Sequence, residues 1–150
     1  MNPLMFLRTV PLFEGLSLDD LLSVDEALKR EEYLANEIVV RQGEPGVTLF
    51  IVARGSASVL LESRDGSAPR EVAQLREGEY FGEMSLFDDV PRSATVVTLT
   101  DAVFLSLDRD RFSTLVMQRP VVLMRICRMF GSRLRETNRR LLAAQGILTP

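Results

Sequence analysis

Residues 80–96 read Tyr80-Phe81-Gly82-Glu83-Met84-Ser85-Leu86-Phe87-Asp88-Asp89-Val90-Pro91-Arg92-Ser93-Ala94-Thr95-Val96. A glycine followed by one helical turn lets backbone N–H groups approach an anion closely, because the first amides of a helix have no partner within it. Arg92 adds a planar guanidinium that can bind two phosphate oxygens. Because a carboxylate repels phosphate, Glu83 is expected to pair with two donors such as a ribose hydroxyl and Arg92 itself. The sequence therefore predicts a phosphate site with a sugar site beside it.

Strand signals surround this stretch. From about residue 31 to residue 108, short runs rich in β-branched and aromatic residues alternate with turn residues. The turns are rich in glycine, and Gly43, Gly46, Gly55 and Gly78 lie in them. The predicted strands cover residues 37–41, 48–52, 56–61, 71–75, 93–99 and 102–107. Many short strands at regular spacing indicate an antiparallel β jelly-roll barrel.

Helices are predicted on both sides of the strands. Ser17 with an acid three residues later is typical of a capping box and predicts a helix from Leu18 to about Lys29. Asp108 is expected to cap a short helix. Pro120 suits the first turn of a last helix, which is expected to run from Val121 to about Leu142.

The fold class is therefore mainly β with flanking helices. One domain is expected over residues 1–150. Its parts are a helical N-terminus over about 1–30, a β-barrel over about 31–108 and C-terminal helices over about 109–143. The barrel is expected to include a short helix directly after Gly82, at the predicted phosphate site.

The last predicted helix carries an apolar stripe with alternating spacings of four and three residues. It consists of Leu123, Cys127, Phe130, Leu134, Thr137 and Leu141. Such a stripe can pack on the barrel, or it can form a short heptad seam between two copies of the chain. Both interpretations stay open, so a homodimer through the C-terminal helix is one expectation.

Composition limits the classes of function. The chain has 150 residues, of which 46% are apolar and 26% charged, as in soluble globular proteins. It has no histidine, so we expect no metal, no cofactor and no catalytic residue. The net charge of −3 predicts no direct binding to nucleic acid. Without about 20 consecutive apolar residues or a secretory signal, no membrane insertion and a cytoplasmic location are expected, and the single cysteine, Cys127, agrees with a reducing compartment.

Two segments together resemble a known motif. Phe81-Gly82-Glu83-Met84-Ser85-Leu86-Phe87 and Pro91-Arg92-Ser93-Ala94-Thr95-Val96, with nine positions from Glu83 to Arg92, are similar to the phosphate-binding cassette of cyclic nucleotide-binding domains. That family includes the catabolite activator protein, the regulatory subunits of cyclic-nucleotide-dependent kinases and the cytoplasmic domains of cyclic-nucleotide-gated channels. The resemblance covers nearly the whole chain, from the segment at residues 10–13 to the terminal helix.

The resemblance implies roles for particular residues. Glu83 would accept a hydrogen bond from the ribose 2′-hydroxyl, and Arg92 would pair with the cyclic phosphate. The remaining phosphate contacts would come from the backbone amides of Gly82, Met84, Ser85 and Ala94 and from the Ser93 hydroxyl. The ligand expected first is cAMP and the second is cGMP, because in the family a hydroxyl at the Ser93 position can favour guanine.

The resemblance also implies that the last helix covers the ligand. Candidates for a side chain over the purine are Arg125 and Arg128, with Met129 and Arg133 as further candidates. The predicted function is a non-catalytic regulatory domain that signals through movement of this helix. The alternative is a ligand-independent dimerisation or interaction module. No helix-turn-helix domain follows Leu142, so output is expected to pass to an effector domain or partner protein that the sequence does not identify.

Overall fold

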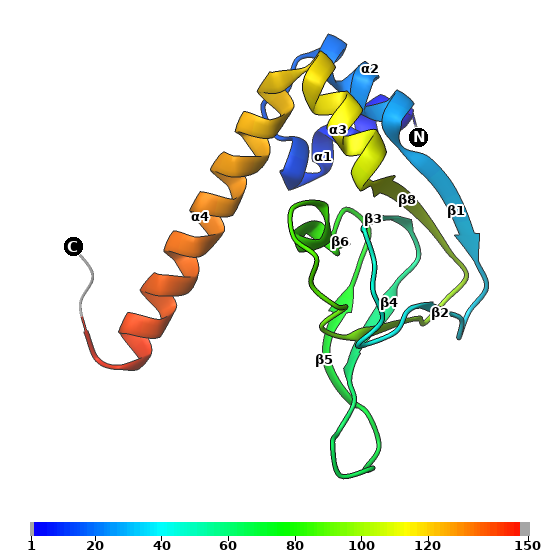
Figure 1. The fold of residues 1–150 in the computed structure, drawn as a ribbon, viewed down its shortest axis with the longest axis vertical. Coiled ribbons are helices and arrows are strands. Elements are labelled where there is room, and N and C mark those ends of the chain that lie inside the picture. The colour runs from blue at the N-terminus through cyan, green and yellow to red at the C-terminus, as the bar shows by residue number, and fades with distance from the viewer. Residues whose placement is uncertain (1, 148–150) are drawn as a thin grey trace.

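The computed structural model describes residues 2–147 (Figure 1). Two α-helices and a 3-10 turn come first: α1 (Pro3–Thr9), η1 (Pro11–Phe13) and α2 (Leu18–Ala27). The strands of the described chain are β1 (Lys29–Tyr33), β2 (Ile38–Val40), β3 (Thr48–Arg54), β4 (Ala57–Leu61), β5 (Arg70–Leu75), β6 (Tyr80–Phe81), β7 (Thr95–Thr98) and β8 (Ala102–Asp108). A second 3-10 turn, η2 (Glu83–Leu86), lies between β6 and β7. Helices α3 (Arg109–Gln118) and α4 (Pro120–Ala144) follow β8.

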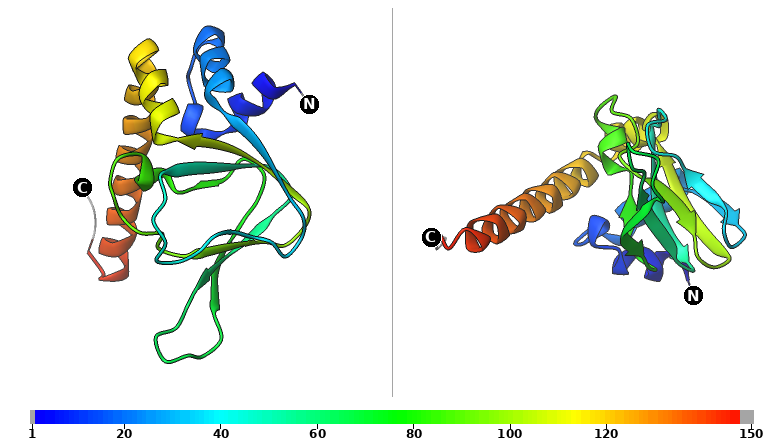
Figure 2. Two further views of the ribbon diagram at one scale, coloured as in Figure 1. Left: turned by 45° about the vertical axis from the view of Figure 1, so that its right-hand side comes forward. Right: turned by 90° about the horizontal axis from the view of Figure 1, so that it is seen from below.

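The strands form two four-stranded sheets in which every pair is antiparallel. One sheet has the strand order β1-β8-β3-β6, and the other has the order β2-β7-β4-β5. The sheets face one another, and α1, α2 and α3 gather at one end of them (Figure 2). These antiparallel sheets with flanking helices confirm the predicted fold class.

Strand β3 is buried on both of its faces. Leu49 and Ile51 belong to the core that the helices cover, whereas Phe50 and Val52 belong to the core between the sheets. This division follows from the alternation of side chains along a strand. Phe50 also pairs with Phe81 of β6, and their rings are stacked with centroids 5.1 Å apart. Phe81, at the start of the predicted phosphate site, is therefore held against a strand that is buried on both faces.

The predicted strand and helix positions agree closely with the structure, with two omissions. Each of the six predicted strands overlaps an observed strand, with bounds that differ by at most two residues. Ser17 caps α2 by accepting from the Asp20 amide at 3.1 Å, and Asp108 caps α3 by accepting from the Arg111 amide at 2.8 Å. Pro120 is the first residue of α4, as predicted. Strands β1 and β6 were not predicted.

Strand β1 corrects the predicted end of the first long helix. Helix α2 ends at Ala27 rather than near Lys29, because Leu28 has extended backbone angles and Lys29 already pairs with Ser106 of β8. The segment reads Lys-Arg-Glu-Glu-Tyr, and charged residues of this kind are depleted in strands. Because β1 is an edge strand of its sheet, its charges also discourage pairing with another chain.

Helix α4 packs on the body only along its first half. Leu123 and Phe130 contact the core beneath the helices. Further along the same stripe, Leu134 and Leu141 are 62% and 57% exposed, and Cys127 is exposed as well. Figures 1 and 2 show the second half of α4 extending away from the sheets. Packing on the barrel therefore accounts for only part of the apolar stripe.

Candidate functional site

The predicted phosphate and ribose residues line a single cavity. It has a volume of about 280 Å³ and lies where β6, η2 and the start of β7 meet. Its lining includes all seven of the predicted residues, Gly82, Glu83, Met84, Ser85, Arg92, Ser93 and Ala94. Its apolar wall includes Val40, Val59, Phe81 and Val96. The fold thus brings together residues that are up to twelve positions apart in the sequence.

Gly82 occupies a position that other residues cannot take without strain. Its φ is +82°, in the left-handed region that favours glycine. A Cβ atom at this position would lie 2.5 Å from Arg92 Nη1 and 2.6 Å from the carbonyl oxygen of Thr48. The turn η2 begins at the next residue, and the Ser85 amide donates to the Gly82 carbonyl at 3.1 Å. The absent side chain lets the turn approach the Arg92 guanidinium closely.

Arg92 is buried, and three parts of the chain hold it in place. Its Nη2 donates to the Thr48 carbonyl at 2.9 Å, and its Nη1 donates to Ser85 Oγ at 3.3 Å. The guanidinium carbon lies 5.8 Å from the centroid of the Phe50 ring, a cation–π contact. The Arg92 backbone exchanges hydrogen bonds of 2.9 and 2.8 Å with Glu44 and Gly43 in the β2–β3 loop. Contacts within the chain thus fix the position of the side chain.

The charge of Arg92 has no carboxylate partner among the described residues. Its exposed fraction is 9%, yet within residues 2–147 no Asp or Glu forms an ion pair with it. Burial lowers the pKa of the Arg92 guanidinium, because desolvation disfavours its charged form. An arginine nevertheless stays protonated in proteins. A buried, fixed and uncompensated positive charge at the wall of a cavity favours an anion inside that cavity.

Glu83 pairs with the last helix rather than with Arg92. Its carboxylate lies 3.7 Å from Nη1 of Arg133, and the Glu83 side chain is 25% exposed. The Arg133 guanidinium also lies over the ring of Tyr80, 4.8 Å from its centroid. The Tyr80 hydroxyl donates to the sulfur of Met129 at 3.4 Å, and burial raises the pKa of Tyr80 to about 12. Helix α4 is therefore attached to both residues that flank the start of the cassette.

The four candidates for a side chain over the purine occupy different places. Met129 and Arg133 contact Tyr80, and Arg133 contacts Glu83 as well. Arg125 lies against Gly15 near the N-terminal helices, where a Cβ on that glycine would be 2.8 Å from Arg125 Nη1. Arg128 is exposed on α4. These contacts bring Arg133 closer to the predicted site residues than Arg125.

Sequence patterns did not reveal three further residues at the site. Thr48 contributes its backbone carbonyl, and a carbonyl contact leaves no signal in residue type. Gly46 lies so close to Arg92 that a Cβ there would overlap the guanidinium, although the sequence indicated only a turn. Arg109 donates to the backbone of the cassette from the start of α3. Since the chain is rich in arginine, only the contacts of Arg109 distinguish it from the others.

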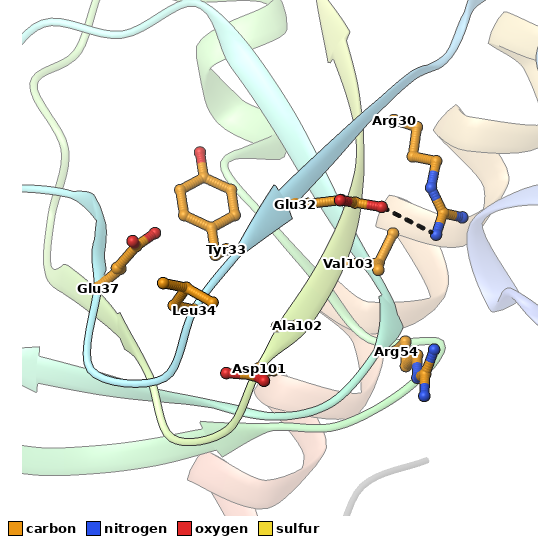
Figure 3. A pocket seen from close by; sticks show the side chains of 9 residues that line it. All are labelled: Arg30, Glu32, Tyr33, Leu34, Glu37, Arg54, Asp101, Ala102 and Val103. Carbon is orange, nitrogen blue, oxygen red and sulfur yellow. Dashed lines mark hydrogen bonds and ion pairs between the residues drawn. The ribbon is translucent and has the colours of Figure 1, made fainter.

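A larger pocket of about 520 Å³ lies along β1 and the start of β8 (Figure 3). Charged side chains of both signs line it, and Arg30 and Glu32 already pair at 3.4 Å, both largely exposed. Asp101 accepts a hydrogen bond from the Ala35 amide at 2.9 Å. Solvated and partly paired charges of this kind exert little attraction on a ligand. The smaller cavity at Arg92 is therefore the stronger candidate for a binding site.

No helix within residues 2–147 has both the length and the apolar character needed to cross a membrane. In the same part of the chain, no three side chains of the types that bind metals lie close enough together to hold an ion.

Comparison with known proteins gives consistent matches. The family model described as cyclic nucleotide-binding domain matches residues 30–119. Human cGMP-dependent protein kinase 2 is 36% identical over 112 residues, which cover 74% of this chain but only 15% of the kinase. The chain thus spans a small part of such relatives.

Solved structures give matches over most of the chain. The N-terminal domain of a transcriptional regulator from Streptomyces coelicolor A3(2) has a TM-score of 0.82 and 30% identity, covering 91% of this chain and 95% of that one. The regulatory domain of Toxoplasma gondii PKA, solved with cAMP, has a TM-score of 0.73 and 29% identity, covering 89% of this chain and 49% of that one.

Proposed function

Because the chain belongs to the cyclic nucleotide-binding domain family, we propose that the cavity at Arg92 binds a cyclic purine nucleotide and that the domain regulates without catalysis. The observation that carries this proposal is the buried guanidinium of Arg92, which faces the cavity and has no carboxylate partner in the described chain. A cyclic phosphate carries a single negative charge and two free oxygens, which suit one guanidinium fork.

The predicted contacts fall into two groups, one for the phosphate and one for the ribose. Arg92, the Ser93 hydroxyl and the amides around Gly82 and Ala94 would bind the phosphate, while Glu83 would accept from the ribose 2′-hydroxyl. Glu83 lines the same cavity as Arg92 and has no ion pair with it, which leaves its second carboxylate oxygen for the sugar. The separation of the acid from the guanidinium supports this division.

The first candidate ligand is cAMP, and cGMP is the second. The structurally similar regulatory domain of Toxoplasma gondii PKA was solved with cAMP, which favours the first. The similarity to cGMP-dependent protein kinase 2 and the Ser93 hydroxyl at the cavity wall favour the second. The phosphate and ribose contacts are the same for both nucleotides, so contacts with the base would decide which of the two binds more tightly.

Movement of α4 is the proposed output. Arg133 and Met129 attach α4 to Tyr80 and Glu83 at the edge of the cavity, so a ligand on Glu83 would change the contacts of the helix. A ligand shifts a conformational equilibrium only by its difference in affinity for the two states. These contacts favour Arg133, ahead of Arg125 and Arg128, as the side chain that faces the ligand.

A ligand-independent dimerisation module is the second candidate function. The exposed positions of Leu134 and Leu141 support it, because a heptad-spaced apolar face on a projecting helix suits a second copy of the same helix. In this alternative the cavity would be a remnant of the family's fold without a ligand.

Isothermal titration of the full chain with cAMP, cGMP and AMP is expected to separate these functions. Binding of cAMP or cGMP with little binding of AMP would support the nucleotide site, because AMP has a doubly charged open phosphate that Arg92 alone neutralises less well. If neither cyclic nucleotide binds and sedimentation shows a dimer, the second function is favoured instead.

Changing Arg133 to glutamine is expected to weaken binding about two- to fivefold. An exposed ion pair such as that between Arg133 and Glu83 contributes at most about 1 kcal/mol. Without the charge of Arg133, the Glu83 carboxylate would repel the phosphate of the ligand more strongly. Arg135→Gln, at an exposed position of the same helix that is not a candidate for contact with the purine, serves as the control and should leave the affinity unchanged.

The same pair of variants tests the movement of α4. An environment-sensitive fluorophore on Cys127, the single cysteine of the chain, would report changes around the helix. The ligand-induced change in emission should be smaller in Arg133→Gln than in the parent or in Arg135→Gln. Equal changes in all three proteins would show that Arg133 does not couple the helix to the site.

A further inference from the structure

Arg109, the first residue of α3, is attached to residues 85–89 of the cassette by several hydrogen bonds. Its Nη2 donates to the Ser85 carbonyl at 2.8 Å and to the Asp88 carbonyl at 3.2 Å. Its Nη1 donates to Asp89 Oδ1 at 2.7 Å. The Asp89 side chain is 87% exposed, so this ion pair adds little by itself. The two carbonyl contacts fix the backbone of residues 85–89 relative to α3.

Ser85 connects this anchor to the phosphate site. Its carbonyl accepts from Arg109, while its hydroxyl accepts from Arg92 Nη1 at 3.3 Å. Ser85 is buried, so its position cannot relax into solvent. Two arginines from different parts of the fold therefore meet on one residue. A shift of the Ser85 backbone would move the hydroxyl that Arg92 contacts.

Aromatic packing holds the same segment from the same side. Phe87 lies edge-to-face with Phe112 of α3 at 5.4 Å and with Phe130 of α4 at 5.7 Å. Arg109 and Phe112 are three residues apart in α3 and hence on one face of the helix. On the face of α3 that meets the cassette, Arg109 thus binds backbone carbonyls of the cassette, and Phe112 packs against Phe87.

The Arg109 side chain is held in a place that leaves one donor unused. Among residues 2–147, its Nε is the buried side-chain polar atom that has no hydrogen-bond partner. Such an atom lowers stability and calls for an explanation in a native fold. The contacts of Arg109 suggest the reason: the guanidinium is oriented to donate to the carbonyls of Ser85 and Asp88, and this orientation leaves Nε without an acceptor.

We propose that Arg109 is a positioning residue for ligand binding: it holds residues 85–89 so that Ser85 and Arg92 stand ready for the cyclic phosphate. This inference rests on the proposed nucleotide-binding function. Arg109 does not line the cavity, so it acts through the cassette backbone and not by touching the ligand. Removing it would leave every predicted ligand contact in the sequence while disturbing the arrangement of those contacts.

The test is the affinity of Arg109→Gln for whichever cyclic nucleotide the parent binds more tightly, measured by isothermal titration of the full chain. We expect binding to be at least about tenfold weaker, because the cassette would have to be ordered by the ligand itself. Arg109→Lys keeps the charge but cannot contact two carbonyls and a carboxylate in one plane, so it should restore part of the affinity. Arg111→Gln, two residues along α3, is the matched control and should bind like the parent.

A second measurement separates positioning from a general loss of stability. In ligand-free protein, the amide NMR signals of residues 83–89 should shift or broaden in Arg109→Gln, whereas those of β4 and β5 should not. Parental affinity in Arg109→Gln, or an unchanged cassette spectrum, would overturn the proposal. If the parent itself binds neither cyclic nucleotide, the proposed function fails, and the spectrum alone then decides whether Arg109 positions the cassette. Should Arg109→Gln not fold, Arg109→Lys provides the same test, with weaker binding expected and parental binding contradicting the proposal.

Discussion

Replacing Arg92 with alanine is expected to weaken cyclic nucleotide binding by about ten- to a hundredfold or more. Hydrogen bonds to charged groups contribute about 1.5–3 kcal/mol, and each 1.4 kcal/mol corresponds to a tenfold change in the dissociation constant. Arg92 is the buried cation of the cavity, and its contacts with Thr48 and Ser85 already fix its direction. The measurement is isothermal titration of Arg92→Ala beside the parent.

The stability of Arg92→Ala should change less than its affinity. The Thr48 carbonyl would lose its donor, which destabilises the fold, but a buried charge without a carboxylate partner would be removed at the same time. Because these two effects oppose each other, thermal unfolding in the absence of ligand should show only a modest difference from the parent. A large loss of affinity with a small loss of stability would identify Arg92 as a binding residue.

Arg54→Ala is the matched control for this prediction. Arg54 lines the pocket along β1 and the start of β8, whose volume of about 520 Å³ exceeds the 280 Å³ of the cavity at Arg92 (Figure 3). If the ligand binds at Arg92, Arg54→Ala should bind like the parent. If Arg92→Ala binds like the parent and Arg54→Ala binds more weakly, the ligand binds in the pocket at Arg54, and the proposed site is wrong.

The sequence indicated the residues that line the cavity better than it indicated the residues that hold them in place. Gly82, Glu83 and Arg92 belong to one motif with fixed spacing, and all three line the same cavity in the structure. Thr48 supports Arg92 through a carbonyl group, and every residue type has one. Arg109 lies 17 positions after Arg92 in a chain with many arginines, and only folding shows that it meets the cassette. Residues that touch a ligand follow a chemical rule, whereas residues that hold them follow the geometry of the fold.

The errors in secondary structure have a similar cause. Strand β1 is rich in charge and lies at a sheet edge, so its pairing with β8 depends on tertiary contacts rather than on strand propensity. The stripe on α4 was open to two interpretations, and the structure divides it: Phe130 packs on the core, while Leu134 is exposed. Periodicity indicates which residues share a face of a helix, but it does not indicate what covers that face.

Replacing Gly82 with alanine is expected to reduce both stability and affinity, whereas the same change at Gly78 should reduce stability alone. Both glycines have positive φ, +82° and +87°, so each alanine variant carries backbone strain of about 1–2 kcal/mol. A Cβ at Gly78 meets nothing within 4 Å. A Cβ at Gly82 would lie 2.6 Å from the Thr48 carbonyl oxygen, and that oxygen belongs to the buried strand β3 and cannot easily move.

The difference between these two variants isolates the close approach of the cassette to Arg92. In Gly82→Ala the new methyl group would also displace Arg92 Nη1, which is 2.5 Å from its position, so the guanidinium would leave the place expected for the phosphate. We expect thermal unfolding to occur a few degrees lower in Gly78→Ala, at about 2–4 °C per kcal/mol, and lower still in Gly82→Ala. Titration should then show parental affinity for Gly78→Ala and at least about tenfold weaker binding for Gly82→Ala. Equal affinities in the two variants would mean that the turn at Gly82 does not shape the phosphate site, because backbone strain alone is common to both positions.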